Sequence, residues 1–319
     1  MTSRISDTNL TSILLDKLND TNTKYSELEL KVSSGKKYLS CSENPSATAN
    51  ATTISNSSDK NSRWLNNVDD ATTYETATDS ALQEIVEAMQ DTSALCVKMN
   101  GGINDTSDYQ SMAEEFDSIL ENLVDLGNSK YNGVELFAGV STGSNPFTVT
   151  RDVDGNITDV SFLNGGTTSQ RSVSISESSD ISYGTLGDSL FEFSHLENTG
   201  TEETPVWVNV DVNIFDTLIS IRDSLNGGTL PADIYTDRIS AGVDNVVAKE
   251  VSCGSSQKRL ESISSSLTST GNVLTNNLSS VTELDSAEAI TELSKLQVSL
   301  TASYKIIAAM NSMSIVNYI

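Results

Sequence analysis

The chain has 319 residues, with 44 Asp and Glu against 19 Lys and Arg and a net charge of −25. A surface this acidic argues against proteins that bind nucleic acid or anionic membranes, because both need clustered cations. The length suffices for two or three domains with a buried core.

The N-terminus has no features of a targeting segment. Its first 20 residues lack a basic stretch followed by an apolar one, and no run of 18 apolar residues occurs in the chain. We therefore expect neither a cleaved signal peptide nor a membrane-spanning helix. Two locations stay open: the cytoplasm, or the cell exterior through an export route that needs no cleaved signal.

The first predicted helix covers roughly residues 10–32. Its apolar residues recur at steps of three and four, which indicates one narrow hydrophobic stripe along a helix. Gly35, within SSGKK at residues 33–37, is a typical residue just after a helix end. The stripe consists of Leu10, Leu14, Leu18, Tyr25, Leu28 and Val32.

Two further helices are predicted before residue 130. Asn44-Pro45 predicts a turn, and Pro45 suits the opening of a helix that runs roughly from Ala47 to Met99. A third helix follows over residues 107–128, with Asp105 or Ser107 as its N-cap.

From residue 146 to residue 212 the hydrophobic period changes from helical to two, which is typical of β-strands. Asp154-Gly155 predicts a hairpin turn between two strands. The clearest strand is the one with alternating valines: Val206, Val208, Val210 and Val212.

Helical periodicity returns over residues 214–225 and again after Pro231. We expect residues 260–319 to form one long amphipathic helix with a narrow, coiled-coil-like seam. A narrow seam cannot be buried by one helix alone, so this helix needs a partner. The terminal part of its seam comprises Ile290, Leu293, Leu296, Leu300, Tyr304, Ile307, Ile315 and Tyr318.

The order of these elements predicts a mainly α fold. Its N- and C-terminal segments form a long-helix bundle or coiled coil, and a small β-rich domain is inserted between them. We expect a terminal coiled-coil region (1–35 with 285–319), an α-helical bundle domain (36–145 with 213–284) and an outer β-rich domain (146–212). The two terminal stripes, residues 10–32 and 290–318, are the predicted assembly interface.

The sequence predicts no enzyme, no cofactor and no metal site. Asp152-Val153-Asp154-Gly155-Asn156 resembles a calcium loop in part, but it lacks the glycine and glutamate at the spacing such a loop needs, and a hairpin turn explains it. The single histidine, His195, and the three cysteines have no spacing typical of catalysis or metal binding. For the two tryptophans, Trp64 and Trp207, core and interface positions both stay open.

Several motifs outside the β-rich segment resemble the bacterial flagellin superfamily. SSGKK at 33–37 followed by SENP at 42–45 is similar to a signature of that superfamily, although Cys41, Glu43 and Asn44 depart from the usual residues. Later motifs resemble the hook–filament junction members: LGNS (126–129), YNGVELFAG (131–139), IFDTL (214–218), DSAEAITEL (285–293) and SIVNYI (314–319). The resemblance covers about two thirds of the chain.

This resemblance implies a structural component of the bacterial flagellum that needs neither cofactor nor active site. Such a protein forms a homo-oligomeric ring that joins the hook, through hook-associated protein 1, to the flagellin filament. Its terminal helices form an inner coiled coil that becomes ordered on assembly, and the β-domain projects outward. The resemblance further implies a cytoplasmic export chaperone as a partner, and an extracellular location reached without a cleaved signal peptide.

Two alternatives remain at this point. The chain could be a flagellin-type filament subunit, because Tyr131-Asn132-Gly133 is also similar to flagellins. It could instead be an extracellular binding or adhesive module that acts through its β-rich segment.

Overall fold

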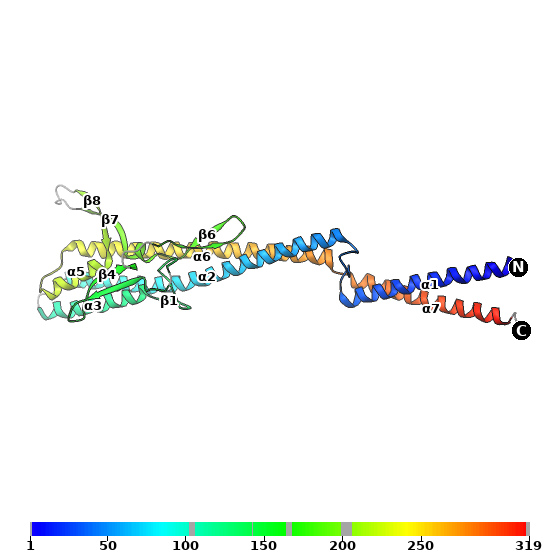
Figure 1. The fold of residues 1–319 in the computed structure, drawn as a ribbon. Coiled ribbons are helices and arrows are strands. Elements are labelled where there is room, and N and C mark those ends of the chain that lie inside the picture. The colour runs from blue at the N-terminus through cyan, green and yellow to red at the C-terminus, as the bar shows by residue number, and fades with distance from the viewer. Residues whose placement is uncertain (1, 102–105, 142, 164–167, 199–205, 317–319) are drawn as a thin grey trace. The chain divides into compact units, whose positions relative to one another are not determined.

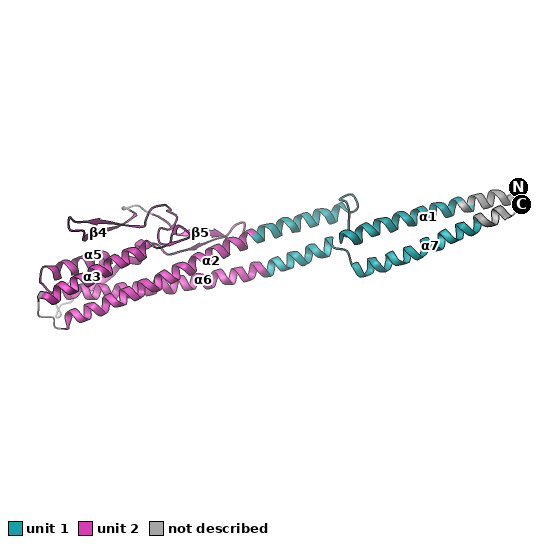
Figure 2. Cartoon of the chain, turned by 90° about the horizontal axis from the view of Figure 1, so that it is seen from below, with its two compact units in different colours: residues 1–62, 269–319 teal, residues 63–268 magenta. Residues whose placement is uncertain are grey.

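The computed structural model describes residues 2–101, 106–141, 143–163, 168–198 and 206–316. The chain forms two compact units, one of residues 1–62 with 269–319 and the other of residues 63–268 (Figure 2). Both long helices of the middle of the chain contribute to each unit.

Helices dominate the fold, as the sequence predicts (Figure 1). They are α1 (Thr2–Ser34), α2 (Pro45–Asn100), α3 (Thr106–Gly127), α4 (Gly187–Phe191), α5 (Ile214–Asn226), α6 (Asp233–Thr282) and α7 (Ser286–Val316). Asn44 caps α2, because its Oδ1 accepts a hydrogen bond from Ala47 N at 3.0 Å. Gly35 follows α1 with a φ of +68°, which confirms its predicted role at the helix end.

The strands form separate two-stranded antiparallel sheets. The pairs are β1 (Lys130–Tyr131) with β2 (Val134–Glu135), β3 (Phe147–Arg151) with β4 (Ile157–Phe162), β5 (Arg171–Ser174) with β6 (Asp180–Tyr183), and β7 (Glu192–Asn198) with β8 (Trp207–Asn213). The predicted turn between β3 and β4 is confirmed: Gly155 has a φ of +96°, and Asp152 Oδ1 accepts from Asp154 N and Asn156 N.

The prediction of one continuous helix over residues 260–319 is wrong. The helix is interrupted at residues 283–285, between the end of α6 and the start of α7. Asp285 Oδ1 accepts from Ala287 N at 3.0 Å and from Glu288 N at 3.1 Å, so it caps α7. The hydrophobic period continues across the break, and for that reason periodicity alone does not reveal it.

Within residues 63–268, helices and hairpins share one core. Four phenylalanines meet in it: Phe147 lies 5.4 Å from Phe162 and 5.3 Å from both Phe191 and Phe215, measured between ring centroids. Gly127 makes room for Phe147, because a Cβ there would lie 2.7 Å from the ring. Residues 146–212 thus belong to the same compact unit as the helical residues 63–145 and 213–268.

A second point of attachment holds the β5–β6 hairpin. Ile181 packs with Val68 of α2 and Leu260 of α6 in a small buried cluster. Nearby, the buried carboxylate of Glu75 accepts from Gly184 N at 2.7 Å, and its other oxygen lies 2.9 Å from Cys253 Sγ. These contacts join α2, the hairpin and α6.

Candidate assembly interface

Helices α1 and α7 lie side by side and run in opposite directions (Figure 2). Two residues of the pair are buried among those whose side chains the structure describes, Ala289 (4% exposed) and Leu300 (8%). The other facing side chains are half-buried. The pair therefore covers its apolar seam only in part.

Most of the predicted stripe residues do lie on the facing sides. Spacings of four and three residues along α7 place one residue per turn against α1. The seam consists of Leu14, Leu18, Tyr25, Leu28 and Val32 of α1 with Ala289, Leu293, Leu296, Leu300, Ser303 and Ile307 of α7.

Three predicted stripe residues are not on this seam. Leu10 is 50% exposed, Ile290 52% and Tyr304 55%. On α7 the seam passes through Ala289 and Ser303 instead, one residue earlier in each case. Ala289 and Ser303 are in phase with the seam, whereas the larger side chains of Ile290 and Tyr304 are one position out of phase. Of the last two predicted residues, Tyr318 lies outside the described residues, as does the side chain of Ile315.

Further apolar side chains are exposed on the same two helices. They are Ile13, Leu15 and Leu30 on α1, and Val298 and Ile306 on α7, each at least 44% exposed. The sequence holds a signal for the α7 residues: no Asp or Glu occurs after Glu292, although the whole chain carries 44. A helical segment without acidic residues in so acidic a chain is suited to burial against other protein.

The connections at the inner end of the pair are tied to each other. Lys37 N donates to Thr282 O at 2.8 Å, and Leu284 N donates to Gly35 O at 3.0 Å. Lys36 and Glu283 form an antiparallel β-bridge between these hydrogen bonds. The α1–α2 and α6–α7 connections therefore form a single joint.

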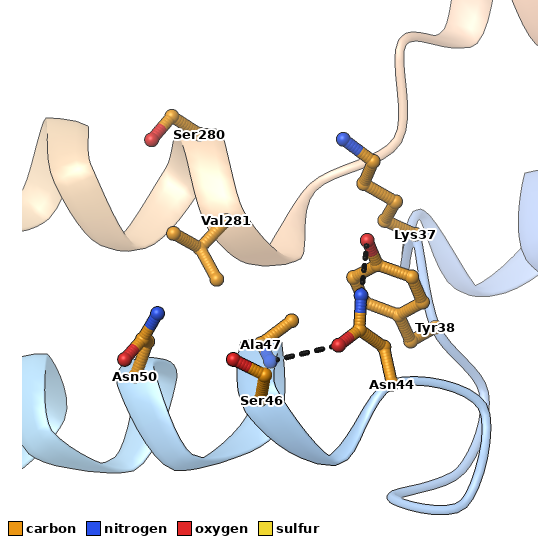
Figure 3. A pocket seen from close by; sticks show the side chains of 8 residues that line it. All are labelled: Lys37, Tyr38, Asn44, Ser46, Ala47, Asn50, Ser280 and Val281. Atoms are coloured by element: carbon orange, nitrogen blue, oxygen red, sulfur yellow. Dashed lines mark hydrogen bonds between the residues drawn. The ribbon is translucent and has the colours of Figure 1, made fainter.

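Side chains reinforce this joint, as Figure 3 shows around a hollow of about 330 Å³. Asn44 donates from Nδ2 to the Tyr38 hydroxyl at 3.1 Å while its Oδ1 caps α2. On the α1 side, Lys31 Nζ lies 3.2 Å from Glu43 Oε2. The SSGKK and SENP motifs thus supply the residues that end one helix and start the next.

A larger open hollow, of about 740 Å³, lies where α7 begins. Its apolar part comes from Leu28, Leu284 and Ala289. Charged side chains of both signs surround it, among them Lys37 and Lys295. An apolar centre surrounded by charged side chains is typical of a surface that contacts another protein.

The three cysteines lie in different environments. Burial raises the pKa of the Cys96 thiol to about 12 and also raises that of Cys253, which keeps both thiols protonated, while Cys41 is exposed. Over the described ranges, no group of three His, Cys, Asp or Glu side chains is arranged to hold a metal ion. None of the helices in those ranges is long and apolar enough to cross a membrane.

Comparison with known protein families identifies both ends of the chain. The model of the bacterial flagellin N-terminal helical region matches residues 5–142, and that of the C-terminal helical region matches residues 236–319. The two models together cover well over half of the sequence. The chain belongs to the bacterial flagellin family. The predicted family and the predicted mainly helical fold with an inserted set of short antiparallel sheets are thereby confirmed.

Two of the proteins that this flagellin-family chain is similar to carry hook-associated names. A curated relative from Escherichia coli K12, "Flagellar hook-associated protein 3", is 24% identical over 304 residues, which is 92% of this chain and 91% of the relative. The chain also resembles the solved structure of flagellar hook associated protein-3 of Legionella pneumophila, with a TM-score of 0.57, 13% identity, and coverage of 72% of this chain and 98% of that one. It also resembles the solved structure of Bacillus cereus FlgL, with a TM-score of 0.53 and 17% identity. That match covers 71% of this chain and 99% of the other.

Proposed function

We propose that this chain is the flagellar junction protein that joins the hook to the filament. The proposal rests on the partial burial of the α1–α7 pair. Most side chains of its seam are only half-buried, and further apolar side chains of both helices are exposed. The match to a relative named hook-associated protein 3, over 92% of this chain, supports the junction role over that of a filament subunit.

The exposed residues supply the free energy for assembly. Full burial of a Val, Leu or Ile side chain stabilises a complex by roughly 1.5–3 kcal/mol. Val298, Ile306, Ile13 and Leu30 are each half-exposed or more in the single chain, so neighbouring copies can bury much of their surface. In this proposal α1 and α7 become fully ordered and buried only in a homo-oligomeric ring.

The ring would contact two other flagellar proteins, hook-associated protein 1 on the hook side and flagellin on the filament side. Before export, a cytoplasmic chaperone would cover the apolar surface of α7. The protein would then act outside the cell, as a structural component without catalytic activity, having been exported without a cleaved signal peptide.

Deletion of the gene in its own bacterium tests this proposal. The deletion strain should build hooks but release flagellin monomers into the medium, and the gene supplied in trans should restore filaments. If flagellin itself is what disappears, while hooks still export the other junction components, the chain is a filament subunit instead. If filaments persist and only adhesion is lost, the β-rich segment is the functional part.

A further inference from the structure

The tip of the β7–β8 hairpin exposes an unusual amount of apolar surface for this acidic chain. Leu196 is 51% exposed, Val206 54%, Trp207 60% and Val208 43%. We refer to these four residues as the hairpin tip. Figure 1 shows the hairpin standing off α5 and α6, within the unit of residues 63–268.

The hairpin is attached to the rest of its unit at two points: at Glu197, which pairs with Val208 of the hairpin tip, and at Val212 near the base. The guanidinium of Arg238, on α6, donates from Nε to Glu197 Oε1 at 2.6 Å and from Nη2 to Oε2 at 3.1 Å, and Glu197 is 5% exposed. Val212 of β8 is buried at 2%. A surface fixed in this way loses little conformational entropy when a partner binds to it.

The exposed apolar residues lie on both faces of β8. Side chains alternate along a strand, so Trp207, Asn209 and Asp211 point to one face, and Val206 and Val208 to the other. Leu196 pairs with Asn209 and lies diagonally across from Trp207 on the first face. A ligand that stacked on one face would leave the opposite valines uncovered. A strand added at the edge of β8 would contact both faces.

The edge itself suits strand addition. In the described part of the chain, β8 pairs with β7 and with no other strand. Lys and Pro commonly block exposed strand edges against pairing. Residues 207–213 contain neither, and Asp211 is their single charged residue.

The charges of this surface favour a basic partner over a second copy of this acidic chain. Glu192 and Asp211 lie on the same face as Trp207, towards the hairpin base. Burial and the nearby carboxylate of Asp188 raise the pKa of Glu192, and burial and Asp159 raise that of Asp216. Glu192 is thus repelled by Asp188, and Asp216 by Asp159. With Asp211 on the same face as Glu192, this surface carries an excess of negative charge that attracts a cationic side chain.

We propose that the edge of β8 binds an extended segment of another protein, antiparallel to β8, with a Lys or Arg opposite Asp211 and an apolar side chain opposite Trp207. Opposite positions in the two strands keep the same spacing, so the two partner residues are four positions apart, about 14 Å along the segment. Backbone hydrogen bonds would hold the segment, and these two side chains would select it. This inference does not depend on the proposed function.

Fluorescence of Trp207 provides the test. In the full chain with Trp64→Phe, Trp207 is the single tryptophan, and the probes are two acetylated and amidated peptides, TKVTVFT and TEVTVFT. The lysine peptide should give a saturable shift of the emission to shorter wavelength, with about a tenfold preference over the glutamate peptide from opposite and like charge pairs. Asp211→Lys should reverse that preference. Asp154→Lys, the same charge change in the exposed β3–β4 turn, should leave it unaltered.

Three results would overturn the inference. The first is that neither peptide shifts the Trp207 emission in a saturable way. The second is that both peptides bind with equal affinity. The third is that the Asp211→Lys protein still prefers the lysine peptide. Asp211 is exposed, so its replacement should leave the fold intact. The circular dichroism of the variant checks that point.

Discussion

Replacing Phe147 by alanine tests whether the β-hairpins and helices of residues 63–268 fold as one unit. Phe147 is 4% exposed and contacts three other phenylalanine rings, which belong to β4, α4 and α5. The substitution leaves a cavity where these elements meet, and Gly127 and Gly187 on two sides cannot fill it.

The size of the effect follows from that burial. A buried Phe→Ala change costs about 3–5 kcal/mol of unfolding free energy. For a unit of this size, each kcal/mol shifts the melting temperature by about 2–4 °C. We therefore expect Phe147→Ala to lower the melting temperature by roughly 6–20 °C. Phe147→Leu, which keeps most of the volume, should cost less than half as much.

The two tryptophans report on different parts of the unit. With Trp207→Phe the fluorescence follows Trp64 on α2, and with Trp64→Phe it follows Trp207 on β8. In a shared core, both signals should melt together and shift together when Phe147 is replaced. If Trp207 melts separately, and the Phe147→Ala change moves its transition while Trp64 keeps its own, the β-rich segment is an independent domain and the shared-core argument is wrong.

Two further predictions concern the electrostatics of β7 and the terminal helices. The hydrogen bonds from Arg238 lower the pKa of Glu197, so its carboxylate stabilises the fold above the ordinary glutamate pKa of about 4.3, and this contribution is lost as the pH falls through the lowered value. Burial raises the pKa of Glu192, so its charged form destabilises the fold at neutral pH. In urea unfolding at pH 7, Glu197→Gln should therefore lower the unfolding free energy and Glu192→Gln should raise it. Both differences from the unsubstituted protein should shrink below pH 4. A lower unfolding free energy for Glu192→Gln at pH 7 would contradict this account. In hydrogen exchange of the monomer, amides of α1 and α7 should exchange much faster than those of residues 82–96, because isolated helices with a half-covered seam are marginal in water. Equal protection of both regions in a monomer would speak against ordering on assembly.

Local sequence signals identified the elements well. The three- and four-residue spacing predicted the helices of the bundle, and the residues at their ends, Asn44, Pro45 and Gly35, act as their positions indicate. The Asp154-Gly155 turn and the valine-rich strand β8 also lie where they were predicted. In each of these cases the signal is contained within a few neighbouring residues.

The features that the sequence reading missed depend on distant residues or on small side chains. Asp285 interrupts the last helix without disturbing its hydrophobic period, and a four-residue capping pattern with Glu288 is the single local sign of it. Ala289 occupies the α7 seam because it is in phase, although Ile290 beside it is larger. Periodicity also cannot tell that Phe147 packs against α5, more than 60 residues away along the chain.

The central claim is that the exposed apolar residues of α7 assemble this protein into the flagellum. Val298 is 70% exposed in the single chain, so Val298→Asp should leave the monomer folded. In assembly, however, it would place a carboxylate in a segment that has none. Val153→Asp, in the fully exposed β3–β4 turn, is the matched control.

The decisive measurement is the amount of flagellin in the medium of the deletion strain that carries each variant. We predict that the Val298→Asp protein is exported but fails to retain flagellin, while the Val153→Asp protein restores filaments. Normal filaments with Val298→Asp would contradict the assignment of this surface to assembly.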